Sequence, residues 1–255
     1  MTLAPHAEPF YADGRADADG QRVGVLLSHG FTGSPASMTP WGRYLAEQGY
    51  AVSVPRLPGH GTTWQDMSRT SYADYYAEIQ REFDALKAHV DKIVVGGLSM
   101  GGGLVLWLAA HRPHDISGVM LVNAAVASNN KQLLAVPLLK HVIKAMPGIG
   151  NDIKKPEVSE YGYTKTPLRP LHSMIRSWKQ VRSDLPKVTA PVLLFRSAED
   201  HVVDPSSARI ILGTISSRDA TERILENSYH VATLDNDADA IFAESAAFVK
   251  RVTEE

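Results

Sequence analysis

The sequence predicts an α/β protein built on an open, mostly parallel sheet that is flanked by helices. Short runs rich in β-branched residues alternate with segments of helical periodicity from about residue 22 onward. The strand candidates are apolar throughout, which is typical of parallel strands covered on both faces. A chain of 255 residues, 44% hydrophobic and 21% charged, fits one large globular domain or one domain with an insertion.

Three strands and three helices are expected in the first half of the chain. The strands are 23–27, 51–54 and 92–96, and the helices are 38–48, 71–88 and 102–111. The longest helix is predicted by aromatic and aliphatic residues that recur every three or four positions. These residues are Tyr72, Tyr76, Ile79, Phe83 and Leu86. Gly49 is a candidate C-cap for the first helix, and Pro113 stops the third.

The same alternation returns near the end of the chain. Short apolar strands are expected at 119–122 and 192–195, and a last strand at 221–225. The terminal helix is predicted by one apolar side, formed by Ile241, Phe248, Val249 and Val252.

Residues 127–187 break this rhythm. One helix is expected to start at Pro137, and a second has an apolar face around Met174 and Trp178. The first helix would bury Leu138, Leu139, Val142, Ile143 and Met146. No strand is expected between the two helices. We interpret 127–187 as a helical cap inserted into a core of residues 1–126 and 188–255. The alternative is a set of ordinary crossover helices packed on the sheet.

Composition excludes several classes of protein. A net charge of −2 gives no basic field for nucleic acid. Without cysteine the chain has no disulfides, no thiolate metal site and no cysteine nucleophile. The N-terminus lacks the pattern of a signal peptide, and no apolar run approaches 18 residues, so a cytoplasmic protein is expected.

The stretch VVGGLSMGGG carries the strongest chemical signal. Gly97, Ser99 and Gly101 form G-x-S-x-G between a predicted strand and a predicted helix, which is the context of a nucleophile elbow. Glycine on both sides permits the sharp turn that presents the serine, and the helix N-terminus favours developing negative charge. A phosphate-binding loop is disfavoured because residues 96–103 contain no lysine.

A serine nucleophile requires a base, and the base requires an acid, in the chain order serine, acid, histidine. Asp200 follows the strand at 192–195 and is the expected acid, with Glu199 and Asp204 as alternatives. His230 is the expected base, because His201 adjoins Asp200 too closely to receive its hydrogen bond.

The oxyanion formed in such a reaction needs backbone N–H donors. Met100, directly after the serine, is expected to supply one donor, and Phe31 in the stretch SHGFTG the other. Ser28 is a rival nucleophile because it adjoins His29, but nothing places it on an elbow.

Three further groups of polar residues have structural interpretations. His111 and His114 are interpreted as surface histidines, since no carboxylates accompany them as in a metal site. The acids Asp235, Asp237 and Asp239 lack the glycine and glutamate of a calcium loop and are expected to cap the terminal helix. His60 is expected in a tight turn near the site, without a chemical role.

Five stretches together resemble the bacterial monoacylglycerol lipases and related carboxylesterases of the α/β-hydrolase superfamily. They are GVLLSHGFTGSP, PRLPGHGT, GLSMGG, EDHVV and NSYHVATLD, and they occur in the family's order between about residues 22 and 250. The resemblance implies the α/β-hydrolase fold, a triad of Ser99, Asp200 and His230, oxyanion donors at Phe31 and Met100, and a cap over an acyl tunnel. It also implies a cap glutamate that binds the glycerol end of the substrate, which alignment by eye assigns to Glu160, with Glu157 as the alternative.

The expected activity is hydrolysis of monoacylglycerols or similar medium-chain carboxylic esters through an acyl-enzyme, with no metal or organic cofactor. Thioester cleavage, perhydrolysis and C–C bond hydrolysis use the same triad and remain alternatives, and a non-catalytic binding protein is the weakest one. The expected partner is a small ester or lipid. Apolar residues of the cap around Leu133, Leu134, Val136, Leu138 and Leu139 exceed what one buried face needs, which suggests transient contact with lipid surfaces.

Overall fold

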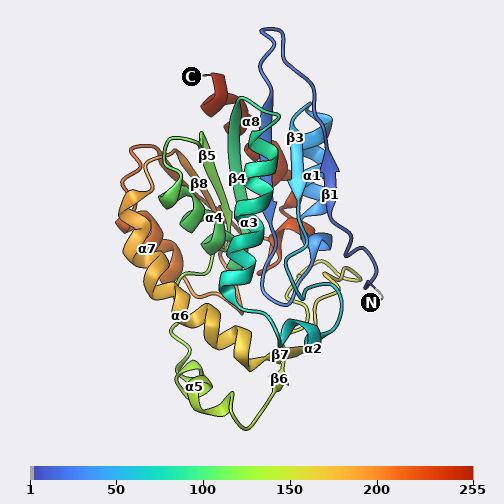
Figure 1. Cartoon of the computed structure of the whole chain (residues 1–255), viewed down its shortest axis with the longest axis vertical. Coiled ribbons are helices and arrows are strands. Elements are labelled where there is room, and N and C mark those ends of the chain that lie inside the picture. The colour runs from blue at the N-terminus through green and yellow to red at the C-terminus, as the bar shows by residue number, and fades with distance from the viewer. Residues whose placement is uncertain (1–2, 255) are drawn as a thin grey trace.

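A seven-stranded sheet runs through the computed structural model, which describes residues 3–254 (Figure 1). The strand order is β1-β3-β2-β4-β5-β8-β9. The strands are β1 (Phe10–Ala12), β2 (Val23–Ser28), β3 (Ala51–Val54), β4 (Lys92–Leu98), β5 (Gly118–Val122), β8 (Val192–Ser197) and β9 (Ala220–Leu225). Only β1 within this sheet runs antiparallel to its neighbour, and the rest pair in parallel. The expected mostly parallel sheet is confirmed, and β1 is an addition that the sequence did not predict.

Helices cover both faces of the sheet. On one face lie α1 (Thr39–Glu47) and α8 (Ala238–Glu254), and on the other lie α3 (Tyr72–Lys87), α4 (Met100–His111), α6 (Leu168–Asp184) and α7 (Ser206–Thr214). Successive strand residues point to opposite faces. In β2, Leu26 joins the cluster under α3 and α4, whereas Val25 and Leu27 pack with Trp41 of α1. This two-sided burial explains why the strands are apolar throughout.

The carboxyl ends of the parallel strands gather the loops that matter for chemistry. The loop after β2 contains His29, Ser99 follows β4 directly, and Asp200 follows β8. His230 lies in the loop after β9. In an open α/β sheet this edge is where ligands bind.

The chain between β5 and β8 contains α5 (Val136–Leu139), the short strands β6 (Ala145–Pro147) and β7 (Lys165–Pro167), and α6. Figure 1 shows α5, β6 and β7 at the opposite end of the molecule from the C-terminus. We call residues 127–187 the cap segment, and these limits remain a prediction. No helix within residues 3–254 is long and apolar enough to cross a membrane.

Two expectations about the cap segment are wrong. The helix predicted from Pro137 to Met146 ends at Leu139, and β6 and β7 pair antiparallel where no strand was expected. The apolar side chains at Leu138 and Val142 are about four-fifths exposed, so no core stabilises a longer helix there. Met146 instead pairs with Thr166 in the two-stranded sheet.

Candidate active site

Ser99 lies at the sharp bend between β4 and α4. Its backbone has φ 56° and ψ −119°, outside the regions that a non-glycine residue ordinarily adopts. The bend is held by its own backbone, because Ser99 N–H donates to the Val122 carbonyl at 3.0 Å and Ala125 N–H donates to the Ser99 carbonyl at 2.9 Å. The side chain is thereby presented at the N-terminus of α4.

The glycines beside this bend are required by close backbone approach. A Cβ atom on Gly97 would lie 2.4 Å from the Gly101 carbonyl, and one on Gly101 would lie 2.2 Å from the Ser28 carbonyl oxygen. A Cβ on Gly30 would lie 3.2 Å from the Ser99 Cβ atom. The chain around Ser99 therefore leaves no room for side chains at its flanks, as the motif predicts.

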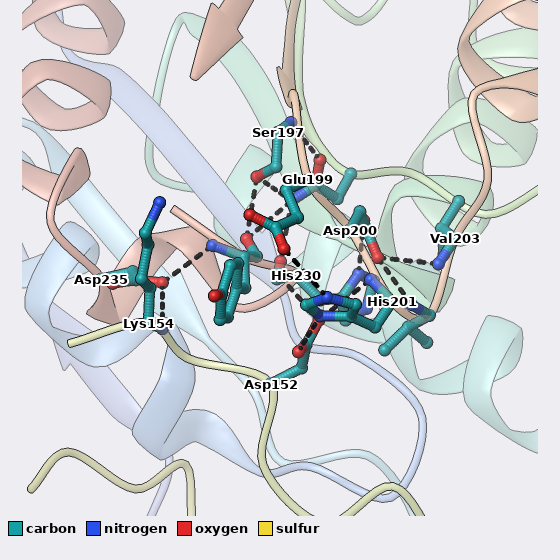
Figure 2. A network of polar contacts seen from close by, with 12 residues as sticks. Asp152, Lys154, Ser197, Glu199, Asp200, His201, Val203, His230 and Asp235 are labelled. Carbon is teal, nitrogen blue, oxygen red and sulfur yellow. Dashed lines mark hydrogen bonds and ion pairs between the residues drawn. The ribbon is translucent and has the colours of Figure 1, made fainter. Parts of the chain in front are cut away.

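His230 is held by Asp200. The His230 Nδ1–H donates to Asp200 Oδ2 at 2.9 Å, and both side chains are nearly fully buried. Asp200 Oδ1 accepts the backbone N–H groups of Val202 and Val203, each at 2.8 Å (Figure 2). Because a carboxylate only accepts hydrogen bonds, the imidazole keeps its proton on Nδ1 and leaves Nε2 free to accept one.

The alternative residues for the acid, the base and the nucleophile have other partners or positions. Glu199 is exposed and contacts His201 Nε2 at 3.3 Å. Asp204 accepts hydrogen bonds from Asn129 and from the Ser206 backbone. His201 Nδ1 pairs with Asp152 at 2.7 Å. Ser28 is fully buried at the end of β2.

The loop after β2 is held by its own buried His29 and contacted by buried His60 from the loop after β3. His29 Nδ1–H donates to the Gly30 carbonyl at 3.0 Å, and His29 Nε2 accepts the Leu57 N–H at 3.2 Å. The His60 ring packs edge-on against those of His29 and Phe31. The Gly30 carbonyl and the Phe31 N–H share one trans peptide and point in opposite directions, so the His29 bond orients the Phe31 donor.

Burial keeps both His29 in this loop and His60 in the loop after β3 neutral. It lowers the pKa of His29 to about 4 and holds the pKa of His60 well below its usual value, with the neighbouring His29 adding to the effect at His60.

A cavity of about 310 Å³ joins these groups. Ser99 and His230 both line it, together with Phe31 and side chains of the cap segment, mostly apolar. The cap residues include Leu133, Val136, Met146, Ile149, Leu168, Leu171, Met174 and Trp178. An apolar cavity of this size with a few polar groups is typical of a small-molecule site.

Glu160 adds a carboxyl group to this cavity. A Cβ atom on Gly33 would lie 3.3 Å from Glu160 Oε2, which places the carboxylate beside the loop after β2. Burial is the main cause that raises the pKa of Glu160 to about 7; the charge of His230 opposes this rise, and the charge of Asp152 adds to it. Glu157, the alternative, is exposed.

The pKa of His230 is also shifted by burial and by neighbouring carboxylates. Burial lowers its pKa, but the hydrogen bond and charge of Asp200, together with the charges of Glu160 and Asp152, outweigh burial and leave the pKa raised. Asp200 is the partner in direct contact, so the imidazolium formed during a proton transfer is stabilised chiefly by that carboxylate.

Sequence reasoning missed two residues that hold the His230 loop. Asn123 donates from Nδ2 to the His230 carbonyl at 2.8 Å, and Asp152 accepts the His230 N–H at 3.1 Å. Asn123 directly follows β5, so its place at the carboxyl end of a central strand could have been noticed. Asp152 stands in an aperiodic part of the cap segment and carries no such signal.

Of the three acids expected to cap the terminal helix, Asp239 lies in the first turn of α8, whereas the side chains of Asp235 and Asp237 accept hydrogen bonds elsewhere. Asp235 accepts the backbone N–H groups of Tyr229, Lys154 and Lys155, and Asp237 accepts that of Asn227. Their carboxylates satisfy loop amides that have no strand partner. His111 and His114 are exposed, and no group of three or more potential metal ligands occurs among residues 3–254.

The fold and the serine elbow define an α/β hydrolase. A family model described as "Serine aminopeptidase, S33" matches residues 20–237. The chain belongs to this family.

Known proteins resemble the chain over nearly its whole length. It is 43% identical over 95% of its length to a thermostable monoacylglycerol lipase from a Bacillus species, covering 94% of that protein. It is 27% identical over 89% of its length to a carboxylesterase from Bacillus subtilis, covering 92% of that protein. Among solved structures, one described with the metagenome-derived lipolytic enzymes LipS and LipT superposes with a TM-score of 0.93 at 40% identity, covering 98% of this chain and all of that one.

Proposed function

We propose that the chain hydrolyses monoacylglycerols or similar medium-chain carboxylic esters to a fatty acid and an alcohol. The chain is a serine ester hydrolase, and the narrower substrate class is the proposal. One observation carries it: Ser99 and His230 line a single, mostly apolar cavity that is also lined by the carboxyl group of the half-buried Glu160. An acyl chain fits the apolar part, and a hydroxyl-bearing alcohol fits the carboxyl group.

In the proposed reaction Ser99 Oγ attacks the ester carbonyl while His230 Nε2 takes the serine proton. Asp200 keeps the imidazole in the required tautomer through the 2.9 Å bond. His230 then returns the proton to the leaving alcohol, and a water molecule repeats the attack on the acyl-enzyme to release the fatty acid.

The oxyanion of each tetrahedral intermediate accepts hydrogen bonds from the backbone N–H groups of Phe31 and Met100. Each donor is worth about 3 kcal/mol in the transition state. The His29 bond to the Gly30 carbonyl supports this role of Phe31. The first turn of α4 places Met100 directly after the nucleophile.

In this proposal residues 127–187 form a cap whose apolar side chains bind the acyl chain, and Glu160 accepts hydrogen bonds from the hydroxyl groups of the alcohol. The cap also makes transient contact with lipid surfaces. Leu134, Leu138 and Val142 are about four-fifths exposed. The segment carries eleven Lys and Arg against four Asp and Glu, whereas the whole chain has a net charge of −2. Exposed apolar side chains with basic neighbours suit a lipid–water interface.

A hydrolysis profile tests the substrate class. We expect monoacylglycerols of medium chain length to exceed diacylglycerols and matched thioesters in kcat/KM. Glu160→Gln should raise KM for monoacylglycerols about tenfold, because a hydrogen bond to a charged group is weakened, and should leave simple methyl esters nearly unchanged. A preference for diacylglycerols or thioesters would contradict the proposed substrate class. An equal effect of Glu160→Gln on monoacylglycerols and methyl esters would contradict the role given to Glu160.

A further inference from the structure

One carboxylate of the cap segment contacts both loops of the acid–base pair. Asp152 Oδ2 accepts the His230 N–H at 3.1 Å and the His201 N–H at 3.3 Å. His201 is the neighbour of Asp200 in the chain. Asp152 Oδ1 pairs with His201 Nδ1 at 2.7 Å, and the Asp152 carbonyl accepts the Val231 N–H at 3.0 Å. Figure 2 shows Asp152 reaching toward His201 and His230 from the cap side.

The chain next to Asp152 is held to the same place by a second carboxylate. Asp235, from the loop after His230, accepts the Lys154 and Lys155 N–H groups at 2.7 and 2.8 Å. It also accepts the Tyr229 N–H at 2.9 Å. Residues 152–155 and 229–231 are thus held together by two carboxylates, Asp152 from the cap segment and Asp235 from the loop after His230.

The same piece of the cap segment is tied to Glu160. Asn151, next to Asp152, accepts the Glu160 N–H at 3.1 Å and donates to the Val158 carbonyl at 3.0 Å. A displacement of residues 151–155 would therefore move both the Asp200–His230 pair and Glu160, the carboxylate proposed to bind the alcohol.

We infer that Asp152 is a positioning residue through which the cap segment holds Asp200 and His230 in register for proton transfer. This inference rests on the proposed function, since the catalytic role of Asp200 and His230 is part of that proposal. Asp152 is buried and lines the cavity beside Ser99, so it lies close enough to act on the pair by charge as well as by its hydrogen bonds.

The charges around this carboxylate set the direction of a pH effect. His230 faces the carboxylates of Asp200, Glu160 and Asp152, all of which raise its pKa against burial. Exposed His201 faces Asp152 and Glu199, and its pKa is raised chiefly by its hydrogen bond to Asp152. Loss of the Asp152 charge removes one influence that favours the imidazolium, so the pKa of His230 falls.

The test compares Asp152→Ala and Asp152→Asn with Asp204→Asn, using p-nitrophenyl acetate, an ester too small to depend on Glu160. Asp204 is a matched control, because it also joins the cap to the core, through Asn129, without contacting His230. Circular dichroism checks folding. If Asp152→Ala fails to fold, Asp152→Asn alone decides, since its amide oxygen still accepts one backbone N–H.

We expect Asp152→Ala to lower kcat about 10- to 100-fold, the loss that misplacement of a catalytic group produces, with a smaller loss in Asp152→Asn. In both variants the acid limb of the kcat/KM profile moves to lower pH. Asp204→Asn keeps the wild-type kcat and acid limb. Wild-type kcat and pH profile in the Asp152 variants, or the same changes in Asp204→Asn, would overturn the inference.

Ser99→Ala separates this inference from the proposed function. If Ser99→Ala is inactive while the Asp152 variants behave as wild type, only the positioning role of Asp152 fails. If Ser99→Ala turns over the ester as the wild type does, the proposed function fails and the inference fails with it.

Discussion

At the scale of a residue, the carboxyl group of Glu160 lowers the free energy of unfolding when it is ionised. Its carboxyl group has a pKa of about 7 in the folded chain, raised first by burial, against 4.5 as the ordinary value. Between these pH values the folded state binds the proton that the unfolded state has released. The free energy of unfolding therefore falls as pH rises from about 4.5 to 7.

Removing this carboxylate should stabilise the protein only at higher pH. Glu160→Gln is expected to raise the free energy of unfolding at pH 8, by at most about 3 kcal/mol, with little change at pH 4.5. Urea unfolding at both pH values measures the effect, and Glu157→Gln, at an exposed position, is the control. An equal gain at both pH values would contradict a burial origin.

In the proposed mechanism, His29 acts on catalysis through the Gly30–Phe31 peptide and does not contact the substrate. His29→Leu removes the bond that orients the Gly30–Phe31 peptide, and kcat on p-nitrophenyl butyrate should fall about 100-fold, as for a lost oxyanion donor. His29→Asn, whose amide N–H lies close to the position of Nδ1, should recover part of the loss. Equal kcat in His29→Leu and the wild type would exclude this brace.

At the scale of an element, the elbow between β4 and α4 depends on close contact with β2. The Ser28 and His29 carbonyls lie against Gly101, where a Cβ atom would be 2.2 and 2.6 Å from their oxygens. Backbone cannot yield as a flexible side chain can, so the turn and the end of β2 must shift together if a methyl group is added.

Gly101→Ala should therefore destabilise the chain by about 3 kcal/mol or more, as overpacking against a fixed backbone does. Gly213→Ala is the matched control in α7, because within residues 3–254 no atom beyond its chain neighbours and its own helix backbone lies within 4 Å of a Cβ there, and it should be neutral or stabilise by up to about 1 kcal/mol. The midpoint of urea unfolding measures both. Similar midpoints for the two variants would refute the packing argument.

The helix α5 and the turn after it present apolar side chains to solvent. Leu138 and Val142 are 79% and 80% exposed, so serine at both positions should change the free energy of unfolding by less than about 0.5 kcal/mol. Hydrolysis of a dissolved ester should be unchanged, whereas hydrolysis of monoacylglycerol in micelles should fall severalfold. Equal rates on micelles would argue against contact of the cap with lipid.

At the scale of the whole molecule, the parallel sheet could be predicted closely from the sequence. Ala51–Val54 is a strand with the expected limits, because an apolar run between turn residues has few alternative structures. The positions of the proposed triad Ser99, Asp200 and His230 at the carboxyl edge of the sheet could be predicted for a related reason, since each directly follows a strand or lies in the loop after one. β1 has only three half-exposed or exposed residues, too few to give a pattern.

The cap segment was less predictable because its structure depends on contacts distant in sequence. Asp152 and His230 are 78 positions apart. The strands β6 and β7 form a two-stranded sheet in which each is the other's partner. Helical periodicity at 138–146 indicated a buried face, but no core lies beneath it. Side chains that line a cavity or face solvent can show the same spacing as a packed helix.

The central claim is that Ser99 becomes a nucleophile because His230 removes its proton. Labelling with a fluorophosphonate, located by mass spectrometry of peptides, tests this claim most directly. We predict one adduct on Ser99 in the wild type and a labelling rate at least about 1,000-fold lower in His230→Ala, as when one member of a triad is lost. An adduct on another residue, or an unchanged rate in His230→Ala, would contradict it.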